Sequence, residues 1–287
     1  EGSVTERSAT ERLASFALWS DAKSVKAHCE AVIESATDRL DALKSTQYSS
    51  LKLLLRDYNA LLLLLDTPMG LSGLLFNTHP DKAVREAAQS CERSLSAFHT
   101  ALGVDRKLYD RFAAIEPTDV EGAPAQSKRL YQLTMRDFKR SGVSLNEAQR
   151  ERIKAINDEL TQLTQRFSKN VNGDTRRVEI SRDELKGLPQ DFIKGKPKAD
   201  NDAIILTTDY PDFFPFQKYA ESRSARAKLY KAFMQRGYPA NVEVLKRVLT
   251  LRHEFAQLLG APTWAAYNAE DKMVGSAETV DEFLKTL

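Results

Sequence analysis

Apolar residues recur every three or four positions along most of this chain, which is the spacing of a helix with one buried face. Residues 51–65 are apolar almost all round and predict a helix buried on most sides, which Asp66-Thr67-Pro68 is expected to end. A further helix is predicted to open at His79-Pro80-Asp81 and to close at Gly103. The first stripe contains Val25, Cys29, Val32, Ala36, Leu40 and Leu43.

The clearest predicted helix follows Gly142, which is expected to end a preceding helix at residues 125–141. Ser144 and Glu147 have the spacing of a capping box, in which side chains satisfy free amides of the first turn. The apolar positions that follow are Ile153, Ile156, Leu160, Leu163 and Phe167. Because their steps alternate between three and four, we expect a long antiparallel hairpin of this helix with residues 125–141, ending at Asn172-Gly173.

The pattern changes after Gly173. Residues 177–181 and 203–208 have the composition of short strands, separated by a segment rich in glycine and proline. Tyr210-Pro211-Asp212 predicts a turn and a new helix start. Helical spacing then returns in the segments 220–236, 242–259, 264–272 and 277–287. The predicted fold class is therefore mostly α, with many helices and a small β insertion near 177–208.

Three regions are predicted along the chain. Residues 1–120 form an N-terminal helical region, residues 121–175 the helical hairpin, and residues 176–287 a small β element followed by helices. The last segment carries Val280, Phe283, Leu284 and Leu287 without a glycine, asparagine or proline to close it. We therefore expect the third region to be the start of a domain that is cut off at Leu287.

The charge balance excludes an obligate polyanionic partner. The chain of 287 residues has 42 Lys and Arg against 40 Asp and Glu, a net charge of +2, so no nucleic acid or acidic membrane is required. Residues 125–180 carry twelve basic and seven acidic residues, which is typical of a solvated helix face. No apolar run reaches about 18 residues, so no membrane span is expected.

The two cysteines, Cys29 and Cys91, lie in helical apolar registers and belong to no C-x-x-C motif. We expect buried, unpaired thiols, with a disulfide between them as the alternative. The first residue is Glu1 rather than methionine, so we expect a processed or trimmed start. A soluble cytoplasmic or periplasmic location fits these features, and the sequence does not choose between the two compartments.

Residues 253–257 read His-Glu-Phe-Ala-Gln, one residue short of the H-E-x-x-H signature of zinc peptidases. That signature needs two imidazoles one helical turn apart, and the amide of Gln257 is a poor zinc ligand. The other histidines are His28, His79 and His99, and none has a second histidine three or four positions away. We interpret His253 and Glu254 as part of a packing helix, so that no residue of this chain is predicted to bind metal.

Other candidates for chemistry are weak. The acidic pairs Asp158-Glu159 and Asp281-Glu282 are of a kind that is frequent on exposed helix faces. Ser72-Gly73 lacks the strand and helix that flank the serine in a nucleophile elbow. The Asn172-Gly173-Asp174 turn lacks the further oxygens of a calcium loop. Five aromatic residues surround two prolines, and we expect core packing at a domain corner rather than a peptide cleft: Tyr210, Phe213, Phe214, Phe216 and Tyr219. No catalytic residue is predicted, and the substrate-binding residues are unknown.

Several stretches together resemble the thimet oligopeptidase and oligopeptidase A family of zinc metallopeptidases, peptidase family M3. They are Pro80-Asp81-Lys82-Ala83-Val84-Arg85-Glu86-Ala87-Ala88, Arg136-Asp137-Phe138-Lys139-Arg140-Ser141-Gly142, Glu159-Leu160-Thr161-Gln162-Leu163, Phe167-Ser168-Lys169-Asn170-Val171, Leu251-Arg252-His253-Glu254-Phe255-Ala256-Gln257-Leu258-Leu259-Gly260 and Asp271-Lys272-Met273. The resemblance runs from about residue 40 to the end. Each motif alone is weak, and their order and spacing together are specific.

The resemblance implies a two-lobed helical fold around a deep channel that admits only short, unstructured peptides. It also implies zinc-dependent hydrolysis by a signature that lies beyond the part matched here, so none of the family's metal or catalytic residues maps onto this chain. The chain is then the N-terminal, non-catalytic portion of such a peptidase, which forms channel wall and scaffold and is expected to be inactive and zinc-free alone. Its partners would be short peptides and the missing C-terminal catalytic half, with no nucleic acid and no membrane.

Two other functions remain open from the sequence. The chain would be a self-standing helical interaction module if its catalytic half is genuinely absent. A basic helical hairpin at residues 125–171 that binds nucleic acid is a third interpretation. Aromatic residues do not interleave with its lysines and arginines, which disfavours a stacking platform for bases.

Overall fold

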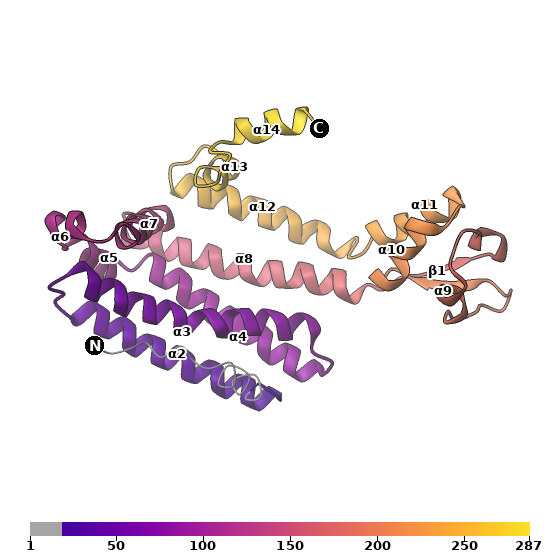
Figure 1. The fold of residues 1–287 in the computed structure, drawn as a ribbon, viewed down its shortest axis with the longest axis horizontal. Coiled ribbons are helices and arrows are strands. Elements are labelled where there is room, and N and C mark those ends of the chain that lie inside the picture. Colours follow the sequence, from indigo (N-terminus) through magenta and orange to yellow (C-terminus); the bar gives the residue numbers. More distant parts are fainter. Residues whose placement is uncertain (1–18) are drawn as a thin grey trace. The chain divides into compact units, whose positions relative to one another are not determined.

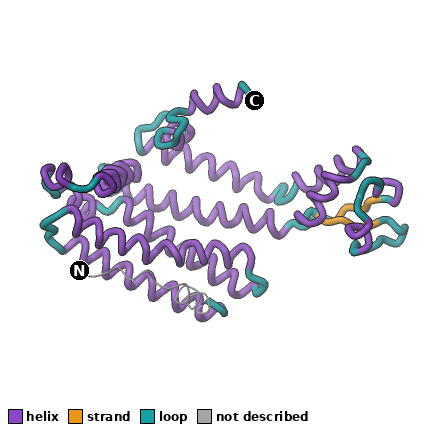
Figure 2. The backbone as a smooth tube through the Cα atoms, in the orientation of Figure 1, coloured by secondary structure: helices purple, strands orange, loops and turns teal. Residues whose placement is uncertain are grey.

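The computed structural model describes residues 19–287, and most of them are helical (Figures 1 and 2). This confirms the predicted fold class, mostly α with a small β insertion. The helices of the first half are α2 (Ala22–Ser45), α3 (Leu51–Thr78), α4 (Lys82–Gly103), α5 (Arg106–Ala113), α6 (Pro117–Gly122), α7 (Ala125–Ser141) and α8 (Glu147–Gly173). The second half contains β1 (Arg177–Ile180), a 3-10 turn (Arg182–Leu185), α9 (Gln190–Lys194), β2 (Ile204–Thr207), α10 (Tyr210–Tyr219), α11 (Arg223–Met234), α12 (Ala240–Leu258), α13 (Trp264–Ala269) and α14 (Ala277–Lys285).

The chain forms two compact units. Unit 1 comprises Glu1–Gln162 with Leu251–Leu287, of which residues 1–18 lie outside the described part, and unit 2 comprises Leu163–Thr250. Helices α8 and α12 each contribute to both units. The division into three regions at residues 120 and 175 remains a prediction.

Helices α2, α3 and α4 pack together as the main hydrophobic core of unit 1. Each begins at a side chain that accepts a hydrogen bond from a first-turn amide, namely Asp21, Ser50 and Asp81, as expected of N-cap residues. The predicted stripe of α2 is largely confirmed, because Val25, Cys29, Ala36, Leu40 and Leu43 are buried. Periodicity in the sequence therefore located the core face of this helix.

Helix α3 does not end at Asp66-Thr67-Pro68, so the predicted stop is wrong. Pro68 lacks an N–H and cannot donate to the carbonyl four residues earlier, yet the helix runs 28 residues to Thr78. Beyond the proline, Leu71 and Ser72 are buried, and the Ser72 hydroxyl donates to the Pro68 carbonyl at 2.6 Å. Packing of this second part outweighs the one hydrogen bond that Pro68 removes.

Because α3 continues past Pro68, it is long enough to be compared with a membrane-spanning helix. Among residues 19–287, α3 alone is long and apolar enough to cross a membrane, judged by length and composition only. The sequence expectation of no such segment assumed that the helix stopped near Pro68. Its buried leucines, among them Leu61 and Leu65, belong to the core that α3 shares with α2 and α4. However, 22% of its apolar window is buried, and Leu63 and Leu74 are exposed, so the prediction of a helix buried on most sides is wrong.

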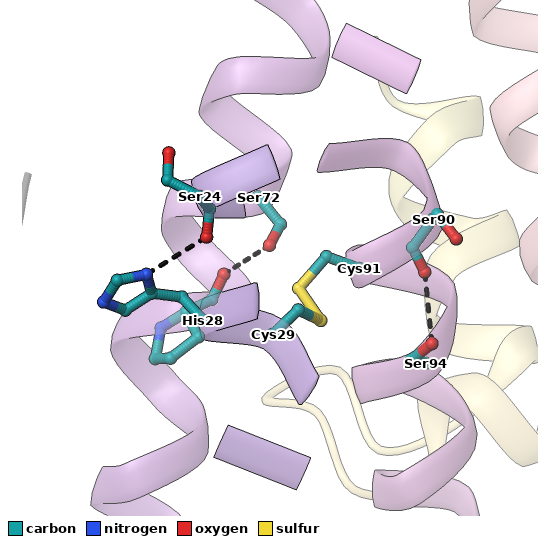
Figure 3. The surroundings of a disulfide bond; sticks show 8 residues. Ser24, His28, Cys29, Ser72, Ser90, Cys91 and Ser94 are labelled. Carbon is teal, nitrogen blue, oxygen red and sulfur yellow. Dashed lines mark hydrogen bonds between the residues drawn. A yellow bond between two sulfur atoms is a disulfide. The ribbon is translucent and has the colours of Figure 1, made fainter. Parts of the chain in front are cut away.

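The expectation of unpaired cysteines is wrong, because Cys29 and Cys91 form a disulfide (Figure 3). The bond joins α2 to α4, with 5.7 Å between the two Cα atoms and a sequence separation of 62. Periodicity placed each cysteine on a core face of its own helix. Only the packing of α2 against α4 reveals that the two faces meet at these positions.

The predicted antiparallel hairpin of residues 125–141 with the next helix is not how these helices pack. Helix α7 packs against α3, α4 and α5. Its Phe138 lies among aromatic rings of other helices, 6.3 Å from Tyr58 and 5.6 Å from Phe112 between ring centroids. Figure 1 shows α7 close to end-on, whereas α8 runs across the view. The heptad-like stripe of α8 required a partner, but its spacing did not identify the sequence neighbour as that partner.

The capping box of α8 is shifted by two residues from the predicted pair Ser144 and Glu147. The backbone amide of Gln149 donates to Asn146 Oδ1 at 2.9 Å, and the amide of Asn146 donates to Gln149 Oε1 at 3.3 Å. Since α8 begins at Glu147, Asn146 is at the cap position and Gln149 at the third helical position. The predicted end at Asn172-Gly173 is confirmed.

Gly142 ends α7 in the left-handed conformation, with φ of 94°. The amide of Val143 donates to the Phe138 carbonyl at 3.1 Å, the closure typical of a Schellman motif. A Cβ atom at Gly142 would lie 2.9 Å from Leu145 Cδ1 and 3.1 Å from Leu259 Cδ2. Glycine is therefore required both for its backbone conformation and for the close approach of two leucines.

We expect Gly142→Ala to lower the free energy of unfolding of unit 1 by about 1–3 kcal/mol, through left-handed strain and overpacking. The measurement is urea denaturation followed by circular dichroism. Gly70→Ala is the matched control, because Gly70 lies within α3 and has no atom within 4 Å of an added Cβ. That variant should be neutral or stabilising by up to about 1 kcal/mol. Equal effects of the two substitutions would contradict the role assigned to Gly142.

Unit 2 contains the only β structure of the described chain, as predicted. Strands β1 and β2 pair antiparallel, with Val178 opposite Leu206 and Ile180 opposite Ile204. These residues form a second core with α10 and α11, in which Phe216, Ala225 and Leu229 are fully buried. The short helix α9 within the glycine- and proline-rich connection was not predicted.

Candidate functional site

Three of the stretches that carry the family resemblance, residues 136–142, 251–260 and 271–273, lie together in unit 1 around the side chain of Arg140. This arginine lies in the last turn of α7, and its side chain is 14% exposed. Its Nη1 donates to Glu270 Oε2 at 2.5 Å, and its Nη2 donates to the carbonyl of Tyr267 at 2.8 Å. Asp271 Oδ1 lies 3.5 Å from Nη2. One guanidinium thus connects the end of α7 to the segment that follows α13, about 130 residues later.

Tyr267 reinforces this connection from the other side. Its hydroxyl donates to the Arg140 carbonyl at 3.2 Å, and its ring lies under the guanidinium with 4.5 Å between Cζ and the ring centroid. The ring also contacts Phe255 of α12 and Trp264 of α13, at centroid distances of 5.3 and 5.5 Å. Burial raises the pKa of the Tyr267 hydroxyl, so it stays protonated and continues to donate at neutral pH.

Asp271 completes the cluster as a charged partner. A hydrogen bond from Lys272, followed by the charge of Arg140, lowers the pKa of its carboxyl despite an opposing effect of burial. The Lys272 Nζ is 3.0 Å from Asp271 Oδ1. Asp271 therefore remains ionised at neutral pH and holds the two basic side chains by charge. We call Arg140, Tyr267, Glu270 and Asp271 the Arg140 junction.

A pocket of about 480 Å³ lies beside the Arg140 junction. Its lining consists of Lys139, Arg140, Leu259, Gly260, Ala261, Pro262, Ala266, Tyr267, Glu270, Gly275, Ser276, Ala277 and Glu278. The lining contains no histidine, cysteine or aspartate, and the charged groups of Arg140 and Glu270 are bound to each other. These residues offer shape and hydrogen bonding, but no nucleophile next to a general base.

The near-signature at residues 253–257 lies near the end of α12, and the pocket-lining residues Leu259 and Gly260 follow it in the sequence. His253 is exposed, whereas Leu251, Phe255 and Ala256 are buried. Glu254 binds Arg152 of α8 through two hydrogen bonds, of 2.5 and 2.6 Å. Gln257 Nε2 donates to the carbonyls of Ala261 and Pro262, at 3.2 and 3.0 Å. The helix packs as predicted, although His253 itself does not contribute to the core.

The remaining candidates are dispersed and engaged in local contacts. His28 Nδ1 lies 3.0 Å from the Ser24 carbonyl within α2, and His79 follows the end of α3, where its Nδ1 accepts from the amide of Asp81. Asp174 accepts from Arg176 and from the amide of Gly237, at 2.9 Å each. These donors occupy the carboxylate of the Asn172-Gly173-Asp174 turn, which therefore serves to join parts of unit 2.

The aromatic segment of α10 divides between core and surface. Phe213 and Phe216 are buried, and Phe213 stacks on Phe233 of α11 with 3.8 Å between ring centroids. Tyr210 and Phe214 are exposed. The prediction of core packing therefore holds for the two buried rings. The exposed rings of Tyr210 and Phe214 contact each other on the surface of unit 2, with 5.1 Å between their centroids.

Comparison with known proteins identifies the family. The model of peptidase family M3 matches residues 216–287. Saccharolysin of Saccharomyces cerevisiae is 28% identical over 216 residues, which cover 72% of this chain and 30% of that protein. Oligopeptidase A of Haemophilus influenzae is 29% identical over 220 residues, covering 71% of this chain and 32% of that protein. A probable cytosolic oligopeptidase A of Arabidopsis thaliana is 26% identical over 285 residues, covering 93% and 40%. This is an oligopeptidase-like chain of peptidase family M3.

The M3 chain spans 30–40% of the length of these relatives. The family implies zinc, and the side chains present here do not fit that metal. Within residues 19–287, no three residues among His, Cys, Asp and Glu lie together as a metal site. Glu254 is bound to Arg152, and both cysteines are in a disulfide. No step of a reaction is therefore derived through zinc on this part of the M3 chain.

Sequence reasoning missed the roles of Arg140, Tyr267 and Arg152. Composition and periodicity do not indicate that residue 140 contacts residue 267. A helical pattern also does not distinguish a buried arginine from a solvent-exposed one. The one signal in the sequence was the resemblance itself, which included residues 136–142, 251–260 and 271–273. These three stretches meet at the Arg140 junction in unit 1.

Proposed function

We propose that this chain is the N-terminal, non-catalytic portion of a zinc-dependent oligopeptidase and serves as channel wall and scaffold. The observation that carries the proposal is the match to relatives named oligopeptidase A over about a third of their length. The stretches at residues 136–142, 251–260 and 271–273 support it, because they lie together at a packed junction of charged and aromatic side chains.

In the whole protein, the substrate would be short unstructured peptides and the reaction hydrolysis of a peptide bond. Zinc would belong to the catalytic half, where it would supply the Lewis-acid chemistry that activates water for hydrolysis. The contribution of the present chain is then mechanical. The Arg140 junction and the Arg152–Glu254 pair hold α7, α8, α12 and α13 of unit 1 in fixed relation, as the wall of a rigid channel requires.

The test measures zinc content and peptidase activity of the purified 287-residue chain. We expect less than about 0.1 zinc per chain by plasma mass spectrometry after dialysis, and no cleavage of fluorogenic peptides above background. His253→Ala should leave both values unchanged, because His253 has no second imidazole one turn away. One tightly bound zinc per chain that is lost in His253→Ala would overturn the proposal.

A second experiment separates the scaffold from a self-standing interaction module. Reading the coding sequence beyond Leu287 should reveal an H-E-x-x-H motif in the same frame. The longer protein containing it should bind about one zinc and cleave short peptides but not folded proteins. A stop codon directly after Leu287 would instead favour the interaction module.

A further inference from the structure

The disulfide occupies a particular place in the three-helix core of unit 1. Cys29 lies in the second turn of α2, whereas Cys91 lies near the middle of α4. The bond therefore attaches the N-terminal part of α2 to the body of the core. Figure 3 shows the two sulfur atoms between the ribbons of the helices that they join.

The opposite end of α2 is held by polar contacts. Lys44 Nζ lies 3.5 Å from Asp105 Oδ2, and Arg111 Nε donates to the Lys44 carbonyl at 2.6 Å. At the N-terminal end, the polar contacts of Ser24 and His28 are with residues of the same segment, at Asp21 and Ser24. Those contacts stabilise the helix but do not attach it to α4. In the described part of the chain, these contacts of Ser24 and His28 are local, whereas the disulfide attaches this end of α2 covalently to α4.

The disulfide is shielded from solvent. Cys29 is 6% exposed and Cys91 2% exposed, and both belong to the cluster that contains Val25, Ala88 and Leu95. Thiol–disulfide exchange requires a thiolate to reach one sulfur along the direction of the S–S bond. A reductant therefore meets the bond only after α2 separates from α4.

We propose that Cys29–Cys91 is a permanent structural cross-link, closed in an oxidising compartment, rather than a reversible switch. In its formation the two thiols lose two protons and two electrons to a disulfide-bearing oxidant, R–S–S–R, which leaves as two R–SH. Such bonds persist in secreted and periplasmic proteins, whereas the cytosol keeps thiols reduced. The inference narrows the compartment of the chain and does not rest on the proposed peptidase function.

The test uses the 287-residue chain produced in the bacterial periplasm. After denaturation, iodoacetamide should add to neither cysteine, and it should add to both once dithiothreitol has been used in urea. In the folded protein, 1 mM dithiothreitol should reduce the bond at least about 100-fold more slowly than in urea, because attack requires opening of the core. Two labelled thiols in the untreated chain, or equal reduction rates, would overturn the proposal.

Stability provides a separate readout. We expect Cys29→Ala/Cys91→Ala to lower Tm by about 5–15 °C, from the effect of releasing a long closed loop. Chain that is reduced in urea and refolded in dithiothreitol should show a similar loss without any substitution. Ser94→Ala is the matched control on α4, because Ser94 is exposed and its hydroxyl donates to the Ser90 carbonyl of the same helix, and it should shift Tm by less than about 2 °C. An unchanged Tm in both the double variant and the reduced chain would contradict a structural role.

Discussion

Replacing Leu61 by alanine is expected to lower the free energy of unfolding of unit 1 by about 2–5 kcal/mol. Leu61 is fully buried in α3, where that helix packs against α2 and α4. The substitution removes apolar contacts and leaves a cavity that close-packed neighbours fill only in part. Urea denaturation monitored by circular dichroism measures the loss as a lower midpoint with little change in slope.

Leu63→Ala is the matched control, because Leu63 lies two residues away in the same helix and is 56% exposed. Both substitutions replace leucine by alanine in the same helix, so they change helix propensity equally. The difference between their effects on stability therefore reports the burial of the side chain. We expect the control to change the free energy of unfolding by less than about 1 kcal/mol. A loss from Leu63→Ala as large as that from Leu61→Ala would mean that the face of α3 carrying Leu61 is not the one buried in the core.

Replacing Asp212 by asparagine is expected to lower the free energy of unfolding of unit 2 by about 2–4 kcal/mol. Asp212 is 8% exposed and forms an ion pair with Lys196. Its Oδ2 accepts from the amide of Thr207 at 2.7 Å and from the hydroxyl of the same residue at 2.8 Å. Asparagine preserves the shape but removes the charge, so Lys196 is left half-buried without its partner. Asp200→Asn, at an exposed position, should change stability by less than about 0.5 kcal/mol.

The same carboxylate predicts a dependence on pH. Burial opposes its charged form, but hydrogen bonds from Lys196 and Thr207 outweigh burial and lower the pKa of Asp212. Because the pKa is lower in the folded state, the stabilisation is complete above the unfolded value of about 3.9 and is lost as the pH falls through the folded pKa. Denaturation between pH 7 and pH 2.5 should therefore show a steeper acid loss for the natural chain than for Asp212→Asn. Parallel pH profiles would contradict this assignment.

Local signals in the sequence predicted those helices and strands whose formation depends on residues close together in the chain. The stripe of α2, the stop at Gly142 and the strands near 177–181 and 203–208 all depend on residues close in the chain. Errors arose where a distant contact outweighs a local rule. Pro68 should end a helix by its missing N–H, but burial of Leu71 and Ser72 carries α3 onward.

The candidate site was harder to predict for the same reason. The near-signature at His253 could be rejected from the sequence, because an amide at Gln257 is the wrong ligand regardless of fold. The Arg140 junction has no local signature, since its partners Tyr267 and Glu270 come from the other end of unit 1. The resemblance included residues 136–142, 251–260 and 271–273 without indicating that these three stretches touch.

The sequence by itself determined a mostly helical chain with a small β insertion, the core faces of several helices and the lack of an H-E-x-x-H motif. These properties follow from periodicity, turn residues and ligand chemistry, which act over a few residues. Only the tertiary structure decided that Cys29 meets Cys91, that α7 packs on α3, α4 and α5, and that Arg140 joins α7 to the segment after α13. Each of these depends on which buried faces pack together, and the matching of faces is set by the shape and charge of residues far apart in the chain.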